Sequence, residues 1–138
     1  MTSLARLVAA VLSGMLLTCA FLLGAAAPAS AHSQVISSSP ADGQRVEKSP
    51  TQLTFVFSEP SDVNSIAVSL TGPSGPLNVL GTPVETAVND VGHQTIVVPV
   101  TSELPAGLYR ETISATSRID GHTAGSELIF GVRTDVAA

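Results

Sequence analysis

The feature that most constrains the fold is a series of short apolar segments separated by turns rich in Gly and Pro. In 53–57, apolar residues at alternate positions give the period-2 pattern of a half-buried strand. No long segment has a helical period, and 103–106 has room for one helical turn at most. Other strands are expected at 34–38, 66–70, 77–84, 95–100, 108–115 and 128–132. This pattern predicts an all-β fold, a Greek-key immunoglobulin-like β-sandwich or barrel of about seven strands.

A Leu-x-x-Gly-x-Tyr pattern at 104–109 resembles a tyrosine corner. In such a corner the Tyr hydroxyl bonds back to the connection that precedes its strand. We therefore expect Tyr109 to fix the start of the strand that follows; an ordinary buried Tyr is the alternative.

The first 31 residues have the organisation of a secretory signal peptide. Arg6 supplies the positive charge, 7–23 is a mainly apolar run, and 25–31 consists of small residues that end in Ala-Ser-Ala. An uncleaved membrane anchor is the alternative, because the run is just long enough to span a bilayer. We predict cleavage after Ala31 and export of 32–138 to the periplasm, the cell envelope or the medium as one domain that is not embedded in the membrane.

Cleavage at this position changes the composition of the chain. Met1, Met15 and Cys19 all leave with the signal; we expect no lipidation at Cys19, because the apolar run continues beyond it. The mature chain then has no disulfide and no soft sulfur ligand for copper(I). It keeps five of the six basic residues and all 11 acidic ones, for a formal charge of −6. This charge argues against nucleic acid or anionic lipid as a partner and suits a cation.

Two of the three histidines lie where a ligand role has a physical rationale. His32 would become the first residue, so that its α-amine and imidazole can chelate one ion. Asp120 and His122 form an i, i+2 pair that projects to one side of an extended segment, and Gly121 allows the backbone to bend. One amine, two imidazoles and one carboxylate suit tetragonal copper(II), whereas zinc prefers a tetrahedron. The alternatives are an arbitrary first residue and a simple Asp-Gly turn; His93 is interpreted as a surface residue.

Several segments resemble mature CopC-type copper-resistance proteins in the same order. They are 32–43, 53–60, 104–109, 117–122 and 130–132. The resemblance implies an immunoglobulin-like barrel with one copper(II) ion bound by the amine and imidazole of His32, by Asp120 and by His122. It also implies that Glu59 lies nearby and orients a ligand. This chain differs in having no Trp and in having two residues, where the family usually has one, between Ser117 and Asp120.

The resemblance implies a monomeric, non-catalytic copper carrier or buffer, often working beside a CopD-type membrane copper transporter. A small histidine-brace copper monooxygenase is one alternative, because a terminal His with a second His also occurs there. The small size and the single Tyr argue against it. An immunoglobulin-like interaction module without metal is the other alternative.

Overall fold

The computed structural model describes residues 2–24 and 32–137, which fall into two compact units. The first is helix α1 (Thr2–Gly24), within the segment expected to target the chain. In the described part of the chain, no helix is both long enough and apolar enough to cross a bilayer. The expected cleavage sequence, 25–31, lies outside the described residues.

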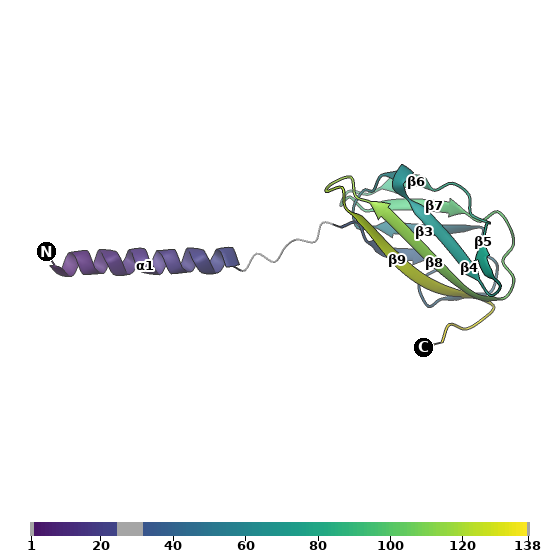
Figure 1. Ribbon diagram of the computed structural model, residues 1–138, viewed down its shortest axis with the longest axis horizontal. Coiled ribbons are helices and arrows are strands. Elements are labelled where there is room, and N and C mark those ends of the chain that lie inside the picture. Colours follow the sequence, from purple (N-terminus) through teal and green to yellow (C-terminus); the bar gives the residue numbers. More distant parts are fainter. Residues whose placement is uncertain (1, 25–31, 138) are drawn as a thin grey trace. The chain divides into compact units, whose positions relative to one another are not determined.

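The second unit is a mainly β domain of two sheets (Figure 1). One sheet has the strand order β1-β3-β7-β6, and the other has the order β2-β9-β8-β4-β5. All pairs are antiparallel except β2 with β9. The elements are β1 (Val35–Ser39), β2 (Arg45–Val46), β3 (Gln52–Phe57), the 3₁₀ turn η1 (Val63–Ser65), β4 (Ala67–Gly72), β5 (Gly75–Leu77), β6 (Val84–Val88), β7 (Gln94–Pro99), β8 (Gly107–Thr116) and β9 (Thr123–Val132).

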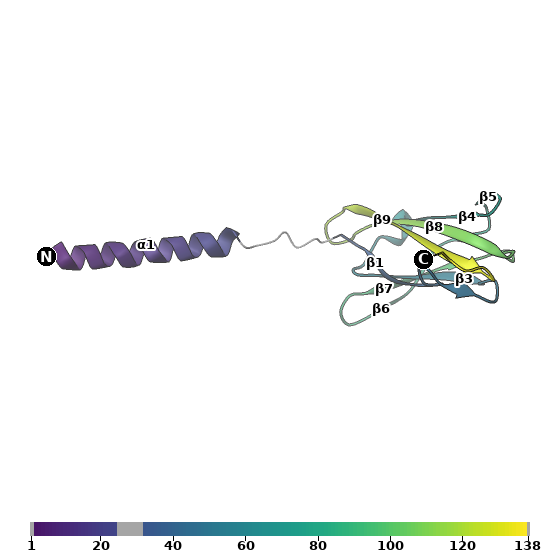
Figure 2. The same cartoon turned by 90° about the horizontal axis from the view of Figure 1, so that it is seen from below.

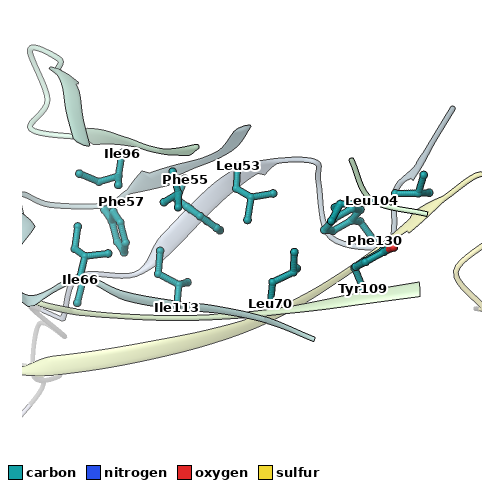
Figure 3. Packing of buried hydrophobic residues seen from close by; sticks show 13 residues of the cluster. Leu53, Phe55, Phe57, Ile66, Leu70, Ile96, Leu104, Tyr109, Ile113 and Phe130 are labelled. Atoms are coloured by element: carbon teal, nitrogen blue, oxygen red, sulfur yellow. The ribbon is translucent and has the colours of Figure 1, made fainter. Parts of the chain in front are cut away.

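The hydrophobic core lies between the two sheets, which Figure 2 shows edge-on as separate layers. Most of the side chains that meet there come from alternate positions of the strands, and Ile66 and Leu104 come from the connections before β4 and β8 (Figure 3). They are Leu53, Phe55, Phe57, Ile66, Leu70, Ile96, Val98, Leu104, Tyr109, Ile113, Ala115, Phe130 and Val132. All of them lie within 53–132, so residues 32–138 contain their own core.

The expected tyrosine corner is present at the start of β8. The Tyr109 hydroxyl donates a hydrogen bond of 2.6 Å to the Pro105 carbonyl, and its ring stacks on Phe130 at a centroid distance of 5.5 Å. Gly107 has a φ of +154°, and a Cβ there would lie 2.3 Å from Cγ of Pro73. Glycine at this position therefore allows the corner to pack closely.

The last strand is longer than the sequence pattern predicts. β9 begins at Thr123 rather than at 128, and it pairs with β8 over ten residues. Residues 123–127 lack apolar alternation and are held in the strand by their pairing with β8. The connection 117–122 is therefore the loop of a long hairpin, which places its side chains at one end of the domain.

Candidate metal centre

The loop 117–122 is a tight turn organised by Ser117. The Ser117 hydroxyl accepts the backbone N–H of Ile119 at 3.0 Å and that of Asp120 at 3.4 Å. The backbone of Ser117 also bonds to Gly121 and His122, at 3.1 Å and 2.9 Å. Gly121 has a φ of +72°, which a residue without Cβ adopts readily. Asp120 and His122 thus converge through this bend and not through an extended strand segment.

Asp120 is fixed by its neighbour in the same turn. Its Oδ1 accepts the backbone N–H of His122 at 2.9 Å, and its Oδ2 lies 3.1 Å from His122 Nδ1. The backbone hydrogen bond from His122 is the main cause that lowers the pKa of Asp120. Partial desolvation acts against it and raises the pKa, whereas the His122 imidazole and the Ser117 hydroxyl lower it further. The group is consequently an ionised acceptor facing the two imidazoles.

His32 joins this pair from the other end of the domain sequence. Its Nδ1 lies 3.5 Å from Asp120 Oδ2, and its ring lies edge-on to that of His122 with 5.0 Å between centroids. One ligand atom from each of the three residues lies within 4.8 Å of the others. The exposed side-chain fractions are 47% for His32, 66% for His122 and 20% for Asp120. The cluster is therefore open to an ion arriving from solvent.

The residue after His32 is anchored firmly. Ser33 is buried, and its hydroxyl donates to the Glu59 carbonyl at 3.1 Å and lies 2.6 Å from the Ser61 hydroxyl. Next to it, Gln34 and Ser58 exchange two hydrogen bonds of 3.0 Å and 2.8 Å. The N-terminal segment is therefore attached to the end of β3, beside the cluster.

Gln94 holds Ser61 and thereby links the two halves of the centre. Its Oε1 accepts the Ser61 N–H at 2.8 Å, and its Nε2 donates to the Ser61 carbonyl at 2.9 Å. Ser61 touches Ser33 on one side and forms a β-bridge with Ser117 on the other. The sequence analysis missed this role. The sequence signal for this role is the alternation of the strand. Gln94 alternates with the buried positions 96 and 98, so its polar side chain also points inward.

Glu59 and His93 lie outside the three-residue cluster. The Oε1 atom of Glu59 is buried and has no hydrogen-bond partner among the described residues. Its predicted role in orienting a ligand stays a prediction. His93 precedes β7, where its backbone N–H and carbonyl both bond to Asn89.

A family model described as the CopC domain matches residues 35–133. The chain belongs to the CopC family. Among solved structures, CopC from Methylosinus trichosporium OB3b is similar to this CopC domain with a TM-score of 0.62 and 22% identity, over 77% of this chain and 100% of that one.

A second similar structure is PcoC, a methionine-rich copper resistance protein from Escherichia coli. It has a TM-score of 0.58 and 27% identity to this chain, over 74% of this chain and 99% of that one. Comparison with curated proteins gives no match. These likenesses support the CopC fold of the two-sheet domain.

Proposed function

We propose that this CopC-family chain is an exported, non-catalytic carrier or buffer that binds one copper(II) ion in copper homeostasis or resistance. The observation that carries the proposal is the meeting of His32, Asp120 and His122, whose ligand atoms lie within 4.8 Å of one another. Imidazole nitrogen and carboxylate oxygen are donors that copper(II) accepts in a tetragonal arrangement.

Cleavage after Ala31 completes the donor set in this proposal. It frees the α-amine of His32, so that this one residue offers two nitrogens. The resulting three nitrogens and one oxygen favour copper(II) over zinc, which prefers a tetrahedron. The E. coli relative is described as methionine-rich, whereas 32–138 contains no Met or Cys. Copper(I), which prefers sulfur ligands, is therefore not the expected cargo.

A carrier role is favoured over oxidative catalysis by the surroundings of the cluster. The aromatic side chains of the domain, Phe55, Phe57, Tyr109 and Phe130, all lie in the core. They are at most 2% exposed, whereas the His32 and His122 side chains of the cluster are open to solvent. In this proposal the domain is a monomer with a Greek-key immunoglobulin-like fold. It lies in the periplasm, the cell envelope or the medium, and it works beside a CopD-type membrane transporter.

The deciding experiment compares two forms of the domain, one starting at His32 and one with a single extra Ala before it. The extra residue converts the amine donor into an amide. We expect one copper(II) per mature domain, and an affinity weaker by about a hundredfold in the extended form. Loss of a residue that only hydrogen-bonds a metal ligand already lowers metal affinity by about 10–100-fold, and here a ligand itself is lost. Competition titration with a copper(II) chelator measures both. Equal affinity of the two forms would remove the terminal amine from the site.

A further inference from the structure

Glu111 is a carboxylic acid on the inner face of the domain. It lies on β8, in the alternation that also turns the core residues Tyr109 and Ile113 inward. Its partners in register are Leu70 on β4 and Leu128 on β9. Only 1% of the residue is exposed. The side chain is therefore enclosed by the apolar interior between the sheets.

No group in the described residues compensates a charge on this carboxyl. Neither of its oxygens has a hydrogen-bond partner there. The charge that acts on it is that of Asp42, in the turn after β1, whose Oδ1 accepts the Ile129 N–H. On the same face, the Tyr109 hydroxyl already donates its hydrogen bond to the Pro105 carbonyl. Arg45 on β2 is paired with Glu47 and Asp135 at the surface.

The remaining strands around Glu111 bring apolar groups. The inward residues of β3 and β7 that belong to the core are Leu53, Phe55, Phe57, Ile96 and Val98. An ionised carboxylate in such surroundings loses its hydration without gaining a partner, which is costly. Burial raises the pKa of Glu111 from the usual 4.5 to about 8, and the negative charge of Asp42 acts in the same direction.

We propose that Glu111 is an internal proton-binding site that is neutral in the folded domain and makes the fold less stable as the medium becomes alkaline. In the unfolded chain this carboxyl ionises near its ordinary pKa, so folding takes up one proton at neutral pH. The stabilising effect of the proton is complete below pH 4.5 and is lost as pH rises to about 8. Within this window the folding equilibrium constant falls by about tenfold per pH unit.

Glu111 is connected to the candidate metal centre through β8, because the loop that carries Asp120 and His122 begins where this strand ends. From Glu111, β8 continues to its end at Thr116, and the loop with Asp120 and His122 follows directly. The proposal needs no metal, because its cause is the buried carboxyl and not the ligands. Its failure would leave the proposed copper site untouched.

The test is urea unfolding of the metal-free domain 32–138 and of Glu111→Gln between about pH 5 and about pH 8. Gln keeps the size of the side chain but cannot ionise. We expect the folding equilibrium constant of the variant, relative to that of the unsubstituted domain, to rise by at least about a hundredfold across this range. Glu127→Gln is the matched control, because Glu127 is a neighbouring carboxyl on the exposed side of β9. It should leave the ratio nearly constant.

A second measurement does not depend on the variant folding. Carbon-13 NMR of the Glu111 side-chain carboxyl in the unsubstituted domain should show a titration midpoint near 8. A midpoint in the ordinary range around 4.5 would overturn the proposal. So would a Glu111→Gln ratio that stays constant with pH.

Discussion

Replacing Gln94 by Met tests the hydrogen-bonded link between the two halves of the candidate metal centre. Gln94 is 0% exposed, and its amide bonds both the N–H and the carbonyl of Ser61 and also donates to the Glu85 carboxylate. Met has a similar size and shape but has neither donor nor strong acceptor. The substitution therefore removes the amide while it largely preserves the packing.

The expected cost follows from the groups that are left behind. Ser61 is itself fully buried, so its N–H and carbonyl would lose their partners without access to water. Each unsatisfied buried group costs about 1–3 kcal/mol. Some relaxation is expected, and the free energy of unfolding should fall by about 2–4 kcal/mol. For a domain of this size this lowers Tm by roughly 10–20 °C.

Urea unfolding with an unchanged m-value measures the loss. Gln52→Met on β3 is the control, because Gln52 is exposed and the same chemical change there should alter stability by no more than about 0.5 kcal/mol. If Gln94→Met is as stable as the control, the two bonds to Ser61 do not hold this end of the domain together. The mature form of Gln94→Met should also bind copper(II) more weakly, since Ser61 contacts Ser33 and Ser117.

Two further predictions concern the ligands and the tyrosine corner. His122→Ala should weaken copper(II) binding by more than about a hundredfold and change the electron paramagnetic resonance spectrum; Asp120→Ala should weaken it less, because water can replace one oxygen donor. His93→Ala is the control and should leave the spectrum unchanged. If His93→Ala changes the spectrum and His122→Ala does not, the ligand assignment is wrong. Tyr109→Phe removes the bond to Pro105 and should lower the free energy of unfolding by about 1 kcal/mol, measured by thermal melting of the metal-free domain; an unchanged Tm would show that this bond adds no stability.

The strands with strong apolar alternation were predictable from the sequence, and those formed by pairing alone were not. The pattern at 53–57 predicted β3, and 95–100 predicted β7 with a shift of one residue. In contrast, β6 is exposed at all five residues, so no buried face marks it. The first half of β9 was missed because its pairing with β8, and not its composition, makes it a strand.

The sequence also identified the residues that converge, through their chemistry and spacing, but not what brings them together. His32, Asp120 and His122 were selected as nitrogen and oxygen donors, and the structure places them within 4.8 Å. Their support by Ser61 and Gln94 depends on contacts between residues 33 positions apart. Glu111 alternates with Tyr109 and Ile113, so its inward position was readable, but the lack of a partner for its carboxyl depends on how the two sheets pack.

The burial of Ser33 has a consequence for how maturation would set metal affinity. If the chain is cut after Ala31, only one residue extends beyond a side chain that is already fixed by Glu59 and Ser61. Consecutive Cα atoms are about 3.8 Å apart, so the new terminus has very little space to explore. Its donors would therefore reach the other ligands at a high effective concentration, which a longer, freely moving tail would dilute. An imprecise cut by the signal peptidase would release a folded domain with a weakened metal site.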